Sequence, residues 1–375
     1  MAITEKYASR LGSGANDGSS AANAWTLAQA VTAVNALGAG GAAGMRINYK
    51  KDGTVDANTT VARTFSVGGT VTSPFIFRGY LTSIGDYDLG RSTGGTGALV
   101  ATNIPEISFT TAGLTFTTYS VVEGISVTSG INGSALVLVA LSAARSVIAT
   151  NSRTGGGTGM QSGTGLVTNC DISHTGTIGT ALNASNTNIV GNRITAGTSG
   201  ATTGILVGST TNSSITIGNV IYRCVTGISG VGTGHTHDIH GNTIAICTTG
   251  FLGSSASTTM QRFTNNLFAD ISGNAIDHQA GAQGPVALSH NRFDRCGGIS
   301  NGAVDWIAAT NWLANITSVT QSQEFVDAAT NDFRLQSTSP AVGAGLFPSR
   351  DIGALQRPAT AAGGIIKVGM RGGFL

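Results

Sequence analysis

Charge, lysine, proline and long apolar runs are all scarce in this sequence. Charged residues make up 10% of the 375 positions, 20 basic residues face 18 acidic ones, and lysine occurs only at Lys6, Lys50, Lys51 and Lys367. A nucleic-acid-binding protein normally carries a basic patch or stripe, so we expect no nucleic acid partner. There are 55 glycines without a three-residue period and only 6 prolines, which excludes collagen.

No run of 18 or more apolar residues is present to span a membrane. The opening Met1–Lys6 lacks the apolar segment of a secretory signal, so we expect a protein made in the cytoplasm that has no membrane partner. Disorder is not expected, because 41% of the residues are hydrophobic and the net charge is only +2.

A capping box and an apolar stripe predict one helix within residues 17–40. Thr26 and Gln29 have the spacing of the capping box, and Gly38 supplies a stop. The stripe consists of Leu27, Ala30, Val31, Val34 and Leu37. From about residue 45 short β-type runs replace this pattern, so we expect the helix to cap a β-structure.

An asparagine recurs at nearly constant intervals later in the chain. The intervals are 23, 27, 23, 24 and 25 residues, and the members are Asn169, Asn192, Asn219, Asn242, Asn266 and Asn291. Apolar residues keep fixed offsets from them, for example two positions later at Ile194, Ile221, Ile244, Phe268 and Phe293. Asn169 fits less well, because Ile172 follows it by three positions.

A coil of about 24 residues, at roughly 3.3 Å each, wraps once around a three-sided core and returns one strand spacing higher. Equivalent residues then stack about 4.8 Å apart, and the asparagines form an amide ladder that spares each buried amide a cost of about 1–3 kcal/mol. The sequence therefore predicts an all-β, right-handed parallel β-helix. The expected divisions are an N-terminal cap with a helix (1–44), the β-helix (45–315), a C-terminal closing segment (316–358), and a linker with an extended tail (359–375).

These coils resemble right-handed parallel β-helix proteins of the pectin-lyase-like superfamily. The stretches 16–18 and 74–80 are similar to the segments that begin many members, and 332–336, 339–345 and 351–354 to those that close them. The resemblance covers nearly the whole chain up to about Arg357 and implies the fold, but these motifs build the ends of the rod and say little about activity. The opening Met1–Tyr7 also resembles tailed-phage members of the group.

The cysteines fit the core better than a catalytic site. Cys224, Cys247 and Cys296 share one offset with Ile271, which predicts an interior column of free thiols. Cys224 and Cys247 lie on neighbouring coils, so a disulfide between them stays open as an alternative.

Two polar groups are the candidates for chemistry. His235, His237, Asp238 and His240 form either a metal or acid–base site or, as we favour, a solvated strand. Asp270 and Arg295 lie at one offset on neighbouring coils, which favours a cross-coil ion pair on the outside.

The superfamily's lyases need carboxylates and a basic proton acceptor, and its hydrolases need two or three clustered carboxylates. Residues 121–300 contain no lysine and only six acids, namely Glu123, Asp171, Asp238, Asp270, Asp277 and Asp294. We therefore predict no catalytic residue, no cofactor and no metal. If the protein is an enzyme, the candidates are Asp238, Asp270 as a charge-holding carboxylate, and Arg295 as a base.

The tail after the glycine-rich linker is apolar and β-prone, and Ile365, Ile366, Val368 and Phe374 are candidates for binding a partner. We predict a non-enzymatic virion protein of a tailed phage: a fibre, spike or capsid-decorating subunit. Its partners would be other virion proteins and sister subunits in a homo-oligomer, plausibly a trimer. The alternatives are a polysaccharide lyase or hydrolase of the phage depolymerase type, and an adhesin that binds host surface glycan.

Overall fold

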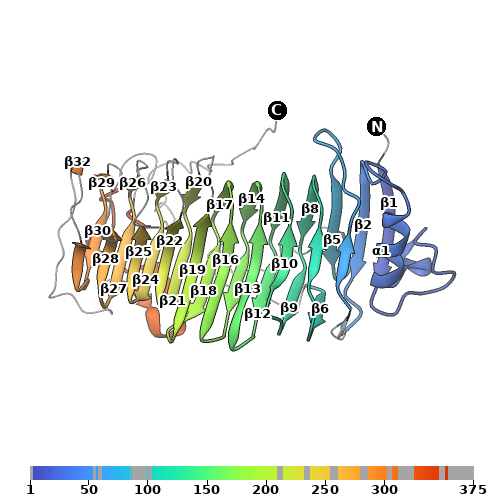
Figure 1. The fold of residues 1–375 in the computed structure, drawn as a ribbon, viewed down its shortest axis with the longest axis horizontal. Helices are drawn as coiled ribbons and strands as arrows, with labels where there is room; N and C mark the ends of the chain where they lie inside the picture. The colour runs from blue at the N-terminus through green and yellow to red at the C-terminus, as the bar shows by residue number, and fades with distance from the viewer. Residues whose placement is uncertain are drawn as a thin grey trace.

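The computed structural model describes residues 3–53, 56–57, 61–84, 86, 99, 104–208, 214–231, 237–253, 261–278, 286–301, 306–310, 325–345 and 351–353. These residues form a parallel β-solenoid of three sheets, and the single α-helix among them lies at the N-terminal end of the rod (Figure 1). The predicted fold class is confirmed.

Three long sheets run the length of the rod, and every pairing within them is parallel. Sheet A has 12 strands, which in spatial order are β1 (Thr4–Ser9), β2 (Met45–Lys50), β5 (Phe75–Tyr80), β8 (Ser120–Glu123), β11 (Ser142–Arg145), β14 (Gly165–Thr168), β17 (Thr187–Val190), β20 (Ser214–Ile217), β23 (His237–His240), β26 (Gln261–Thr264), β29 (Val286–Ser289) and β32 (Trp306–Thr310).

Sheets B and C have 10 strands each. Sheet B contains β3 (Asp56–Ala57), β6 (Glu106–Phe109), β9 (Ser126–Ser129), β12 (Ile148–Asn151), β15 (Asp171–His174), β18 (Arg193–Gly197), β21 (Val220–Cys224), β24 (Thr243–Cys247), β27 (Leu267–Ile271) and β30 (Arg292–Asp294). Sheet C contains β4 (Arg63–Phe65), β7 (Leu114–Phe116), β10 (Ser134–Leu138), β13 (Gly155–Ser162), β16 (Ile178–Ala184), β19 (Ala201–Gly208), β22 (Thr226–Val231), β25 (Thr249–Gly253), β28 (Asn274–His278) and β31 (Gly298–Asn301).

One coil passes through sheets A, B and C in turn, as β20, β21 and β22 do. Strand alternation sends every second side chain inward, where equivalent residues of successive coils stack. Ile194, Ile221 and Ile244 form one such column, are fully buried, and pair in register across β18, β21 and β24. The same alternation sends the intervening residues to the outer face of each sheet.

The N-terminal end of the stack is covered as expected. Helix α1 (Leu27–Asn35) has Thr26 as its N-cap. The Thr26 hydroxyl accepts the Gln29 N–H, while the Gln29 side chain accepts the Thr26 N–H. This reciprocal pair is the predicted capping box. Ala30 and Val34 of the helix are fully buried in the main core, so the helix covers the end of the apolar interior.

The amide ladder lies at the corner between sheets A and B. In the first four members the side-chain Nδ2 donates at 2.9–3.0 Å to the Oδ1 of the asparagine on the next coil, and this Oδ1 also accepts the main-chain N–H of the donating asparagine. The Nδ2 atoms further donate to main-chain carbonyls of the preceding coil, so these buried amides are fully engaged. The members are Asn192, Asn219, Asn242, Asn266 and Asn291.

Asn169 does not belong to the ladder, which corrects the prediction for this residue. Cys170 occupies the ladder position, and its main-chain N–H donates to Asn192 Oδ1 at 2.8 Å. Asn169 lies one residue earlier with φ of 54°, where the next coils have Gly191 and Gly218. Asparagine adopts this left-handed conformation more readily than most residues, so the turn explains Asn169.

The described part of the C-terminal closing segment, residues 325–345 and 351–353, packs on the side of the rod. The hairpin of β33 (Phe325–Asp327) and β34 (Asp332–Leu335), joined by the 3-10 turn Ala328–Thr330, lies against the outer face of sheet B beside β21 and β24 (Figure 1, orange-red). Its apolar residues form a second core with those of the sheet: Val220, Tyr222, Ala245, Leu267, Ala269, Phe325, Ala328, Phe333, Leu335, Ala341 and Ile352.

Candidate functional site

The outer face of sheet B is polar over strands β9, β12, β15 and β18, which we call the open half. Its two outward columns hold mostly hydroxyl and charged side chains, and register pairs them across the coils. The first column is Ser126, Ile148, Asp171 and Arg193, and the second is Thr128, Thr150, Ser173 and Thr195. Over about 14 Å of rod, this half therefore presents groups that hydrogen-bond, except at Ser126, which is buried.

Asp171 and Arg193 are direct neighbours on this face, because their strands pair at these two residues. The carboxylate of Asp171 accepts the main-chain N–H of Leu99 at 2.6 Å. Leu99 is buried although it comes from the long connection between β5 and β6, so part of that connection packs against the open half beside Asp171.

Arg193 is held by an aromatic ring. Its Nη2 donates to the Tyr222 hydroxyl at 3.1 Å, and its guanidinium carbon lies 5.5 Å from the centre of the Tyr222 ring. Among the described residues, Arg193 forms no ion pair with a carboxylate, unlike Arg145, Arg295 and Arg334. Stacking fixes the guanidinium while leaving most of its five N–H donors for another group.

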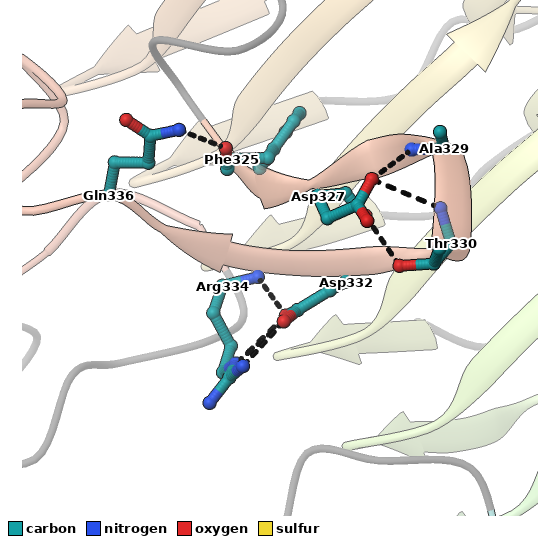
Figure 2. Close-up of polar contacts among 7 residues, drawn as sticks. All are labelled: Phe325, Asp327, Ala329, Thr330, Asp332, Arg334 and Gln336. Carbon is teal, nitrogen blue, oxygen red and sulfur yellow. Dashed lines mark hydrogen bonds and ion pairs between the residues drawn. The ribbon is translucent and has the colours of Figure 1, made fainter.

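The hairpin forms the boundary of this site at the C-terminal side. The Phe333 ring packs 4.9 Å from Tyr222 and, at 88°, edge-on against Phe325 at 5.2 Å. Figure 2 shows the polar contacts around it: Asp327 caps the turn by accepting the N–H groups of Ala329 and Thr330, and Gln336 donates to the Phe325 carbonyl.

Asp332 carries the second carboxylate near Arg193. Both of its oxygens accept hydrogen bonds from the Arg334 guanidinium, at 2.5–3.1 Å (Figure 2). These bonds hold the pKa of Asp332 below its usual value, and attraction to Arg193 adds to the effect. The same pair raises the pKa of Arg334. The arrangement thus combines a fixed arginine with two carboxylates on a hydroxyl-lined face.

Asp270 and Arg295 do meet, in the predicted cross-coil ion pair. Arg295 Nε donates to one oxygen of Asp270 at 2.5 Å and Nη2 to the other at 3.0 Å. Arg295 also pairs with the buried carboxylate of Asp294, which lies 3.7 Å from the buried guanidinium of Arg292. A guanidinium between two carboxylates keeps its proton, so this geometry favours the ion pair over a role for Arg295 as a base.

Asp238 lies elsewhere, on the outer face of sheet A, and is not brought together with Asp270. Alternation on β23 places Asp238 and His240 outward, while His237 is buried beside the inward-facing Ile239. Burial lowers the pKa of His240, and the Asp238 charge opposes this shift. His235 lies outside the described residues. Within the described part of the chain, no three His, Cys, Asp or Glu side chains gather as metal ligands.

The sequence alone does not indicate the open half when the repeat is aligned on Asn169. With Cys170 in the ladder position, Asp171 and Arg193 both follow the ladder by one residue and share a column. Alignment on Asn169 instead gave Asp171 an offset of two, so it matched no other charged residue. A register derived from the apolar residues alone would have found the pair.

The remaining predictions concern the thiols and the tail. Cys224 and Cys247 are buried free thiols that donate to the carbonyls of Tyr222 and Ala245 at 3.3 Å. Burial raises the pKa of Cys224, and that of Cys296 to about 12. Ile365, Ile366, Val368 and Phe374 lie outside the described residues. No described helix is long and apolar enough to cross a membrane.

Comparison with known proteins supports the fold. Residues 103–283, just under half of the chain, match the family described as "Periplasmic copper-binding protein (NosD)". The structure resembles that of pectate lyase Pel9A with a TM-score of 0.67 and 14% identity, covering 96% of this chain and 98% of that one. A rhamnogalacturonan lyase matches with a TM-score of 0.43 and 12% identity over 78% and 74% of the two chains. No curated protein sequence matches.

The described residues do not fit the copper that the family description mentions. Copper(I) selects thiolate ligands. Among the described residues only Cys224 and Cys247 are neighbouring cysteines, and both are buried thiols that already donate to carbonyls. The buried imidazole of His174 is likewise engaged, because its Nε2 bonds the Ile178 carbonyl at 2.8 Å. We therefore derive no copper chemistry for this chain.

Proposed function

We propose that this protein binds an extended polysaccharide on the open half of sheet B. The observation that carries the proposal is the Arg193 guanidinium, fixed by Tyr222 without an ion pair among the described residues and flanked by Asp171 and the column of hydroxyls. A sugar polymer presents hydroxyl groups at regular intervals, which is the ligand chemistry that such a row of donors and acceptors suits.

The stacked arginine favours binding for an entropic reason. Immobilising a flexible side chain on binding costs about 0.5–1.5 kcal/mol, and the contact with Tyr222 has already restricted Arg193. The hydroxyls of the second column supply acceptors for the same ligand, so donors and acceptors lie side by side on the face. Asp171, whose carboxylate accepts the Leu99 N–H, borders the guanidinium. The planar guanidinium can donate two parallel hydrogen bonds to adjacent oxygens of one sugar.

Binding is tested with a panel of soluble neutral and acidic polysaccharides, followed by affinity electrophoresis and calorimetry. We expect Arg193→Met and Asp171→Asn each to weaken binding at least tenfold, which corresponds to about 1.4 kcal/mol. Arg262→Met is the matched control, because Arg262 is exposed on sheet A. Equal affinity in all four proteins, or no retained polysaccharide in the panel, would refute the proposal.

Cleavage is the alternative that the same samples can reveal. The resemblance to a pectate lyase concerns the fold, so activity has to be measured directly through unsaturated products and reducing ends, with and without calcium. If the wild-type protein turns over a substrate, and Asp171→Asn or Asp332→Asn abolishes turnover while binding persists, the protein is an enzyme and not only a binding protein. Asp238→Ala and Asp270→Ala extend the test to the candidates from sequence.

The virion role and the trimer remain predictions from the sequence. They are tested by whether the protein co-purifies with particles and by deletion of 359–375, which we expect to abolish attachment or oligomerisation while the rod stays folded. Unchanged assembly after the deletion would count against the tail as the attachment site.

A further inference from the structure

Sheet C carries a second surface with a different character. The strands β10, β13, β16, β19, β22 and β25 contain no charged residue. On them, register places one hydroxyl residue per coil in a single column: Ser134, Thr158, Thr180, Thr203, Thr226 and Thr249. We call this column the threonine row.

The threonine row faces outward. The residue after each threonine faces the core, since a Cβ added at Gly204 would meet Ile221 and Cys224, and one added at Gly250 would meet Phe268. Alternation therefore turns the threonines away from the interior. Four of them are partly exposed and Thr226, at 9%, is buried, so the threonine side chains project little from the sheet.

The five threonine hydroxyls make no hydrogen bond within the described residues. The same coil spacing does not prevent bonding elsewhere, because Thr150 and Ser173 of sheet B bond each other across neighbouring coils at 2.9 Å. Threonine is stiff about χ1, so the row presents five similarly placed donor–acceptor groups over about 19 Å, at intervals of about 4.8 Å.

Strand propensity alone does not account for the row. Threonine is favoured in strands, but so are valine, isoleucine and tyrosine, and these are absent from the five positions. The other outward column of the same strands has no such regularity, since it holds Gln161, Asn183, Leu206, Ser229 and Leu252. One column of this face is therefore uniform while its neighbour varies.

We propose that the threonine row is a binding surface for a neutral, ordered polysaccharide, with chains packed as in an insoluble fibre. The absence of charge on the six strands favours an uncharged partner, and the repeated unpaired hydroxyls favour one that repeats in the same way and offers its own hydroxyls. This surface is separate from the open half of sheet B and does not depend on the function proposed there.

The test uses retention on microcrystalline cellulose and on chitin. We expect Thr180→Val with Thr203→Val to reduce retention at least tenfold, because valine keeps the shape and stiffness of threonine and removes only the hydroxyl. The matched control is Thr168→Val with Thr264→Val, two partly exposed positions on sheet A, which should leave retention unchanged. Thermal melts of both double variants establish that each remains folded.

Three outcomes would overturn the proposal. Equal retention of the two double variants would show that the row does not bind. Loss of retention in Arg193→Met but not in Thr180→Val with Thr203→Val would assign polysaccharide binding to sheet B. Failure of the wild-type protein to be retained, including a protein that binds ice or a charged resin instead, would exclude an ordered neutral polysaccharide as the partner.

Discussion

On the outer face of sheet B, the open half carries hydroxyl and charged side chains, whereas strands β21, β24 and β27 carry Val220, Tyr222, Ala245, Leu267 and Ala269. The backbone repeats without interruption across this change, so the coil itself does not decide which residues face outward. The apolar positions lie under the hairpin and the segment after it, together with the buried Thr243, whereas most outward positions of the open half are polar. The polarity of most outward side chains thus depends on whether a later part of the chain covers them.

The largest effect should come from removing the ring that joins hairpin to sheet. Phe333 is 1% exposed and packs on Tyr222 and Phe325, so Phe333→Ala should cost about 3–5 kcal/mol in the stability of the covered half. Hydrogen exchange should show residues 325–345 and 351–353 released while the open half stays protected. Val326→Ala is the control, because Val326 is 47% exposed. Protection that falls equally in both halves would mean that they unfold as one.

An unpartnered hydroxyl should be tolerated in one half and not in the other. Thr195 and Ala245 belong to one outward column, and Thr195 is partly exposed whereas Ala245 is fully buried. Ala245→Ser places an unpaired hydroxyl under the hairpin and should cost about 1–3 kcal/mol, whereas Thr195→Val should stay within about 0.5 kcal/mol. Denaturant unfolding measures both. Similar values would contradict the distinction between the halves.

Tyr222 lies on the boundary and should show a smaller effect. Tyr222→Phe keeps the ring against Phe333 but removes the hydroxyl that accepts from Arg193, so we expect a loss of about 1 kcal/mol. Tyr119→Phe should be neutral, since Tyr119 makes no side-chain hydrogen bond among the described residues. A neutral Tyr222→Phe would show that stacking alone holds the arginine.

The smallest effect should appear as a dependence of stability on pH. His174 lies at the corner between sheets B and C in the open half, where the covered half has cysteines and Ile271. Burial lowers the pKa of His174, partly opposed by the bond to Ile178. The unfolded chain therefore binds the proton more readily, and His174 should reduce stability as the pH falls below about 6.5. The loss should deepen until the pH reaches the lower folded pKa.

Unfolding of the wild type and of His174→Asn between pH 8 and pH 5 isolates this contribution. The difference between the two proteins should change with pH only in the acidic part of the range. A constant difference would show that His174 does not titrate differently in the folded and unfolded states.

The fold followed from the sequence because its signals repeat. Five asparagines and the apolar columns beside them specify the coil length and the inward face several times over, and the capping box specifies α1 locally. Asn169 was wrongly assigned to the ladder because asparagine has two separate structural roles, as a buried amide and as a residue that tolerates positive φ. The sequence alone does not distinguish these two roles.

The candidate site was harder to predict than the fold because its charged residues do not repeat from coil to coil. Asp171 and Arg193 occur once each in their column, so no repetition marks them, and the ladder position before Asp171 holds Cys170 instead of an asparagine. The position of residues 325–345 and 351–353 on the side of the rod depends on which outward residues are apolar on three particular coils. That pattern is visible in the sequence only after the inward and outward positions of each coil are known.

The asparagine ladder has a direction as well as a period, since every hydrogen bond from one ladder amide to the next runs towards the C-terminal end. A block from one ladder position to the next, such as 242–265, brings its own donor and its own acceptor. Removing it would rejoin Asn219 to Asn266 with the same geometry, whereas removing an arbitrary number of residues would turn the core side chains of that coil outward. The length of this molecule is therefore adjustable only in whole blocks, each worth about 4.8 Å of rod.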